Sequence, residues 1–187
     1  MALDRNIPDG ARAAAVLLHP HPHFGGNRFH PFIDGLFQRL PPAGVAAFRF
    51  DFANDDPMAT RSQAVQAIDA AAGAVPGAPL ALIGYSFGAG VAAGIADDRV
   101  AAWFLLAPQA DGLARSALGT DPRPKAIVVP ELDQFTPPES IAPLVVGWPS
   151  TTLRTVPGMD HFLGTAEPVI DAAVTWIGGL MRAPGSA

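Results

Sequence analysis

The chain has 187 residues, of which 49% are hydrophobic and 16% are charged, and its formal net charge is −5. This length and composition predict a single globular domain over residues 1–187, with a core from about 12 to 182 and a frayed tail at 183–187, and they exclude a disordered protein. The negative charge argues against a nucleic-acid partner, because phosphate binding needs clustered lysine and arginine. The chain has no cysteine, which excludes disulfides, thiolate metal sites and a cysteine nucleophile. We find no signal peptide and no apolar run of membrane-spanning length, so we expect a cytoplasmic protein without a membrane partner.

Short apolar segments alternate with segments of helical periodicity along the whole chain. The expected strands are 13–18, 45–50, 80–83, 101–106, 126–129 and 151–156. The expected helices are 31–40, 57–72, a stretch after Ser86, a short one around 113–118, 137–146 behind a capping box that starts at Thr136, and 167–181. Because the strands are apolar on both faces, the pattern predicts a three-layer α/β/α sandwich with a mainly parallel sheet of about six strands.

The most informative stretch is Gly84-Tyr85-Ser86-Phe87-Gly88, which follows the strand at 80–83 and opens a helix. A Gly-x-Ser-x-Gly sequence in this context is typical of a nucleophile elbow, a sharp turn that lifts a serine hydroxyl above the sheet edge. Glycine suits the two outer positions because the backbone there passes too close to its neighbours for a Cβ. The alternative is a tight strand–helix turn with a capping serine. An elbow also requires an acid after a later strand and a histidine last.

Both requirements can be met further along the chain. His161 follows the last predicted strand and is the candidate general base, while Asp133, after the strand at 126–129, is the first candidate for the carboxylate that orients it. Glu131 and Asp111 are alternatives for this carboxylate. Asp160 is adjacent to His161 in sequence, so its side chain should diverge, and we interpret it as a solvated loop residue.

The loop after the first strand contains the run His19-Pro20-His21-Pro22-His23. The two prolines have no N–H group, which leaves the backbone amide of His21 as the candidate partner of the Phe87 amide in an oxyanion hole. Alternating histidines in an extended segment could also bind zinc or nickel. No carboxylate or further histidine lies nearby in the sequence, so we expect neither a metal nor a cofactor. We expect His19 to pack under the loop, and His21 and His23 to lie on the rim.

Taken together, these motifs resemble the α/β-hydrolase superfamily. The elbow, the order Ser86, Asp133, His161, and His19-Pro20 after the first strand carry the resemblance. The run at 19–26, the strand end at 49–52 and His161-Phe162 are similar to short, lid-free bacterial members, akin to dienelactone-hydrolase-like and small carboxylesterase proteins. The likeness covers about residues 13–181. The segment before residue 13 looks too short for the antiparallel hairpin that usually leads this fold.

The resemblance implies a serine hydrolase that cleaves a small-molecule carboxylic ester or thioester through an acyl-enzyme. The alternative is a non-hydrolytic protein on the same fold, either a cyclase or isomerase of a biosynthetic pathway or a ligand-binding protein with a vestigial triad. Residues 107–124 are too few for an independent cap, so we expect a shallow cleft that suits short acyl chains. Phe24, Phe135 and Phe162 are the predicted apolar walls of this substrate site.

Overall fold

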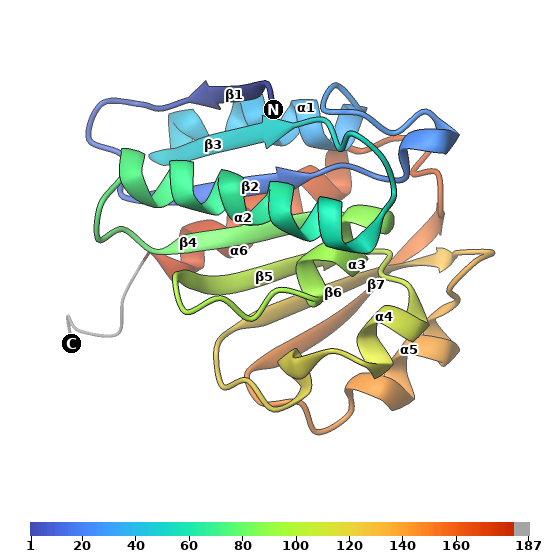
Figure 1. The fold of residues 1–187 in the computed structure, drawn as a ribbon. Helices are drawn as coiled ribbons and strands as arrows, with labels where there is room; N and C mark the ends of the chain where they lie inside the picture. Colours follow the sequence, from blue (N-terminus) through green and yellow to red (C-terminus); the bar gives the residue numbers. More distant parts are fainter. Residues whose placement is uncertain (182–187) are drawn as a thin grey trace.

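A single seven-stranded sheet runs through the computed structural model, which describes residues 1–181 (Figure 1). The strands lie in the order β1-β3-β2-β4-β5-β6-β7, and all neighbours are parallel except β1 and β3. Their bounds are β1 Leu3–Asn6, β2 Ala13–Leu18, β3 Val45–Phe50, β4 Leu80–Tyr85, β5 Val100–Leu106, β6 Lys125–Leu132 and β7 Thr151–Asp160.

Helices cover both faces of this sheet and complete the three layers (Figure 1). One face is covered by α1 (Pro31–Arg39) and α6 (Glu167–Leu180). The other face is covered by α2 (Pro57–Ala74), α3 (Phe87–Ala93), α4 (Ala110–Ala114) and α5 (Pro138–Val145). Three short 3-10 segments, Pro22–Phe24, Pro41–Ala43 and Ala117–Gly119, lie in the connections. The predicted fold class is confirmed.

The strand β2 shows why the strands are apolar throughout. All six of its residues are buried, and successive side chains point to opposite faces of the sheet. The core under α2 and α3 receives one set, Ala14, Val16 and Leu18. The core under α1 and α6 receives the other set, Ala13, Ala15 and Leu17. Because both faces are covered by helices, a polar residue in this strand would be buried in either direction.

The sheet has seven strands where the sequence predicted about six, because the sequence pattern does not reveal β1. Leu3–Asn6 contains a single large apolar residue and lies at the edge of the sheet, antiparallel to β3. Asp4 forms ion pairs with Arg28 and Arg49, at 3.1 and 3.2 Å. This strand is therefore held by pairing and charge from distant segments rather than by its own hydrophobic pattern.

Several predicted bounds also change. β6 and β7 run past their predicted ends, because the two strands keep pairing as far as Leu132 and Asp160. α4 begins at Ala110, earlier than the short helix expected around 113–118. The predicted capping box at Thr136 is wrong, because the N-cap residue of α5 is Pro137 and no side chain caps this helix by a hydrogen bond.

The tail at 183–187 lies outside the described residues. Among residues 1–181, no helix combines the length and the apolar character needed to cross a membrane.

Candidate active site

Ser86 lies at the turn between β4 and α3, at the carboxyl end of the central strands. Its backbone has φ 52° and ψ −112°, a conformation that side-chain-bearing residues rarely adopt. A Cβ on Gly84 would lie 2.3 Å from the carbonyl oxygen of Gly88, and a Cβ on Gly88 would lie 2.1 Å from that of Leu18. The two glycines are therefore required by close backbone packing, and the turn has the geometry of a nucleophile elbow.

Three side chains from three loops form a continuous hydrogen-bonded row at this edge. The Ser86 Oγ lies 3.0 Å from Nε2 of His161, which follows β7. Nδ1 of the same imidazole lies 2.8 Å from Oδ2 of Asp133, which follows β6. The structure thus brings together the serine, histidine and aspartate that the sequence placed after three different strands.

The surroundings of Asp133 determine the state of the histidine. Its side chain is fully buried, and its Oδ1 accepts hydrogen bonds from the backbone N–H groups of Phe135 and Thr136, at 2.9 and 2.8 Å. Burial raises the pKa of Asp133, but these bonds and the one from His161 outweigh it and hold the pKa below its usual value. A carboxylate only accepts, so Nδ1 of His161 carries the proton and Nε2 presents its lone pair to the serine hydroxyl.

The other acidic candidates lie elsewhere. Asp111 is on α4 with 88% of its side chain exposed, and it faces Arg115 at 3.9 Å. Glu131 accepts a hydrogen bond from the Gly158 N–H at 2.7 Å. Asp160 accepts one from the Phe162 N–H at 3.0 Å. None of the three contacts the imidazole of the histidine through a hydrogen bond.

Two further residues, which the sequence reasoning missed, hold the histidine through its backbone. The buried Tyr85 hydroxyl donates to the carbonyl oxygen of His161, and the His161 N–H donates to Oε1 of Gln134 at 3.2 Å. Burial, with the charges of Asp133 and Asp160, raises the pKa of Tyr85, so its hydroxyl stays a donor. For Tyr85 the sequence offered one signal, because this residue lies in the elbow motif directly before the candidate nucleophile.

The two expected oxyanion-hole residues lie next to each other. The rings of His21 and Phe87 are in edge contact, with centroids 4.8 Å apart. Phe87 is the first residue of α3, where a backbone N–H has no acceptor within the helix. Within residues 1–181, neither the His21 N–H nor the Phe87 N–H donates to a protein group. Both amides therefore have no protein acceptor within this part of the chain.

His19 fixes the loop that carries these groups. It is 1% exposed, its Nδ1 lies 2.6 Å from the Pro20 carbonyl oxygen, and its Nε2 accepts the Phe52 N–H at 2.9 Å. Burial lowers the pKa of His19, which keeps the ring neutral with its proton on Nδ1. The expectation that His19 packs under the loop is confirmed.

Aromatic side chains surround the triad at the surface. The ring of Phe135 lies 4.8 Å and that of Phe162 5.8 Å from the His161 ring, while Phe24 lies 5.3 Å from His21. Phe24, Phe135 and Phe162 are 87%, 66% and 62% exposed. The three predicted wall residues thus form an open apolar rim rather than the lining of a closed pocket.

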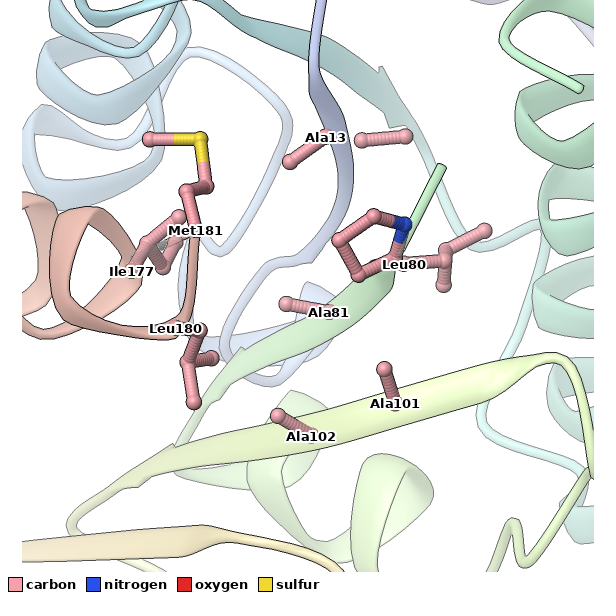
Figure 2. A pocket seen from close by; sticks show the side chains of 10 residues that line it. Ala13, Leu80, Ala81, Ala101, Ala102, Ile177, Leu180 and Met181 are labelled. Atoms are coloured by element: carbon pink, nitrogen blue, oxygen red, sulfur yellow. The ribbon is translucent and has the colours of Figure 1, made fainter. Parts of the chain in front are cut away.

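Two hollows in the molecule lie away from this rim. One of them lies between the start of β4 and the end of α6, and Figure 2 shows the side chains that line it. Its volume of about 10 Å³ has room for about one water molecule. A larger hollow of about 540 Å³ lies beside β6, β7 and α6, where Phe104, Arg154 and Trp176 line it. Neither hollow is lined by a member of the triad.

One charged residue near the rim was also missed by the sequence reasoning. Asp55, in the loop before α2, has its Oδ2 3.7 Å from His21 Nε2 and 3.7 Å from His23 Nδ1. The sequence argument against a metal relied on the lack of a nearby carboxylate, and chain folding supplies one from a distant loop.

Comparison with known proteins gives matches to solved structures only, since no family model and no curated protein matches the chain. A protein of unknown function from Agrobacterium tumefaciens, proposed to be an α/β hydrolase, has a TM-score of 0.85 at 23% identity over 96% of this chain and 91% of its own. An α/β serine hydrolase without a lid from Xanthomonas campestris has a TM-score of 0.77 at 18% identity, over 99% and 90%. Est1E from Butyrivibrio proteoclasticus, solved with ferulic acid, has a TM-score of 0.78 at 17% identity, over 97% and 96%. The chain therefore has the α/β-hydrolase fold, in the form that lacks a lid.

Proposed function

We propose that this chain is a serine hydrolase that cleaves a carboxylic ester or thioester through an acyl-enzyme. The observation that carries the proposal is the unbroken hydrogen-bonded row from Ser86 through His161 to Asp133, at 3.0 and 2.8 Å. A serine hydroxyl is a weak nucleophile near neutral pH and needs a base within hydrogen-bonding distance. The imidazole is such a base, and the buried carboxylate fixes its tautomer.

Acylation begins when the Ser86 Oγ attacks the substrate carbonyl carbon and its proton passes to Nε2 of His161. Asp133 stabilises the imidazolium that forms. The carbonyl oxygen becomes an oxyanion, which the backbone N–H groups of Phe87 and His21 bind; one such donor contributes about 3–4 kcal/mol in transition states of this kind. The imidazolium then gives its proton to the leaving alcohol or thiol, and the acyl group stays on the serine.

Deacylation repeats these steps with water. Nε2 of His161 takes a proton from a water molecule, whose oxygen attacks the acyl carbon, and the same two amides bind the second oxyanion. The proton then returns to the Ser86 Oγ as the acid product leaves. No residue other than the triad and the two amides is needed for the proton balance.

The open rim favours a substrate with a short acyl group. Each methylene that stays in water forgoes up to about 0.8 kcal/mol of burial free energy, so a long chain gains little here. The exposed rings of Phe135 and Phe162 beside His161 offer apolar contact to a small or planar group. The neighbouring structure of Est1E with ferulic acid supports an aromatic acyl group as one such substrate.

The test combines a fluorophosphonate probe with a series of aryl esters of increasing acyl length. We expect the probe to label wild type at Ser86 and to leave Ser86→Ala unlabelled, with thermal midpoints that are nearly equal. We expect kcat/KM to be highest for short acyl chains and for aromatic acyl groups. An optimum at long chains would contradict the open site. Failure of both labelling and turnover would overturn the hydrolase assignment and favour a non-hydrolytic protein.

A further inference from the structure

A second group of polar side chains lies at the edge of the proposed active site and is not used in the chemistry above. It consists of His21, His23 and Asp55, which come from the loop after β2 and the loop before α2. Their candidate ligand atoms all lie within 4.8 Å of one another. Nothing in the proposed ester cleavage requires two imidazoles to face one carboxylate.

The distances are too long for direct hydrogen bonds and close to those around a shared ion. Both histidine nitrogens lie 3.7 Å from Asp55 Oδ2, beyond ordinary hydrogen-bonding distance. Two ligands at 2.0–2.1 Å from a tetrahedral zinc lie about 3.4 Å apart. The side chains of His23 and Asp55 are 69% and 46% exposed, so both have room to rotate toward this spacing.

We propose that His21, His23 and Asp55 bind one divalent transition-metal ion. Two imidazoles and one carboxylate suit Zn²⁺, Co²⁺ or Ni²⁺ better than Mg²⁺ or Ca²⁺, which prefer all-oxygen ligands. Three protein ligands leave a fourth position of a tetrahedral ion for water.

Binding has a consequence for the loop, because His21 already uses its other nitrogen. Its Nδ1 accepts the His23 N–H at 3.2 Å and caps the 3-10 segment Pro22–Phe24. The neutral ring therefore carries its proton on Nε2. A metal on Nε2 moves that proton to Nδ1, which then can no longer accept the His23 N–H. The metal thus exchanges a local hydrogen bond for a link between two loops.

This change falls on the residue whose backbone N–H is proposed to bind the oxyanion. We therefore expect the bound metal to lower turnover by altering the loop around His21. This part rests on the proposed function, whereas metal binding itself does not.

The first experiment measures binding without any turnover. Co²⁺ is titrated into the full chain, and its visible absorption reports a tetrahedral site. We expect one equivalent to bind to wild type and to Ser86→Ala. His23→Ala and Asp55→Asn should each weaken binding by about tenfold or more, because even the partners of metal ligands contribute that much to affinity. Asp111→Asn, an exposed carboxylate on α4, is the matched control and should bind as wild type does.

Two outcomes of this titration would overturn the site. One is no binding to wild type, and the other is equal binding to wild type, His23→Ala and Asp55→Asn, which would place the metal elsewhere. Both substituted residues are partly or largely exposed, and circular dichroism of each variant checks that it is folded.

The second experiment addresses the link to turnover. Zn²⁺ is added to wild type and to the two ligand variants, and each rate is divided by the rate of the same protein in EDTA. We expect Zn²⁺ to inhibit wild type, EDTA to reverse the inhibition, and both variants to resist it. Binding of one equivalent with no change in rate would overturn the link to the oxyanion loop. Equal inhibition of all proteins would point to direct binding at His161 instead.

Discussion

The Tyr85 hydroxyl donates a hydrogen bond to the backbone carbonyl of His161, so the residue before the nucleophile holds the residue that would activate it. The two rings are also in contact, with centroids 5.8 Å apart. β4 and β7 are not neighbours in the sheet, and this bond connects the end of β4 directly to the loop after β7. The position of the imidazole relative to Ser86 therefore depends on a side chain of the elbow itself.

Replacing Tyr85 by Phe removes this donor and keeps the ring. A hydrogen bond of this kind contributes about 0.5–1.5 kcal/mol, so we expect kcat to fall by roughly 2- to 10-fold. KM should not change, because Tyr85 is a positioning residue that is buried below the rim. Steady-state kinetics and the rate of fluorophosphonate labelling check this, and both should fall together. A lower thermal midpoint with unchanged kcat would show that the bond is merely structural.

The acid assignment is tested by a pair of isosteric changes. Asp133→Asn puts an amide where the imidazole needs an acceptor, which favours the wrong tautomer, and we expect kcat to fall on the order of 10⁴-fold. Asp111→Asn changes an exposed side chain with no link to the histidine and should leave kcat within about twofold of wild type. Ester turnover of both variants is the measurement. The reverse pattern would move the acid to α4.

Close packing at the elbow predicts opposite effects for two glycine-to-alanine changes. In Gly88→Ala the new Cβ meets the carbonyl oxygen of Leu18 at 2.1 Å and that of His19 at 2.6 Å, both rigid backbone atoms. We expect a loss of about 3 kcal/mol or more in the free energy of unfolding. Gly73→Ala, on the exposed side of α2 with no atom within 4 Å, should gain about 0.5–1 kcal/mol.

Urea unfolding of the two variants at neutral pH measures this difference. Equal stability of Gly88→Ala and wild type would mean that the end of β2 can move away from α3.

A pH dependence of stability follows from His30, which caps α1. Its Nδ1 accepts the Phe32 N–H at 3.3 Å, and burial, followed by repulsion from His19, lowers the pKa of His30 to about 4. The unfolded chain has the ordinary value near 6.5 and so binds more protons in between. Stability is therefore full above about pH 6.5 and decreases as the pH falls toward 4. The full linkage is about 3 kcal/mol, which solvent screening at this partly buried position reduces to about 1–2 kcal/mol.

His30→Asn separates this contribution from those of other groups. Asparagine is a good N-cap that does not titrate, so the helix start should survive while the pH dependence from residue 30 is lost. Unfolding free energies at pH 7.5 and pH 5 should therefore differ by less in the variant than in wild type. An identical difference in the two proteins would show that His30 is not the titrating group.

The elements with strong patterns could be predicted from sequence, and those set by distant contacts could not. α1 starts at Pro31 and α2 at Pro57, as predicted, because proline suits the first helical position. β1 was missed because its four residues are ordered by pairing with β3. The predicted cap of α5 was wrong. The Thr136 N–H donates to the Asp133 carboxylate, and the helix begins after Thr136, with Pro137 as its N-cap.

The residues of the candidate site divide in the same way, into those that the sequence could predict and those set by distant contacts. Ser86, Asp133 and His161 follow the ends of β4, β6 and β7, and chain order is enough to place them at one edge of a parallel sheet. Gln134 and Asp55 follow no motif, because their contacts are with residues far away in the sequence, Gln134 with His161 and Asp55 with His21 and His23. A linear pattern records what precedes and follows a residue, whereas these contacts depend on how two loops approach each other in space.

The connection from β5 to β6 carries only α4 and a single 3-10 turn, and its shortness affects the kinetics expected of such a site. No covering segment has to open before substrate enters or product leaves, so turnover should not be limited by a gating motion. An acyl group on Ser86 would also stay exposed to every nucleophile in the solution. A small alcohol at high concentration would then compete with water for that acyl group, and part of the product would appear as a new ester.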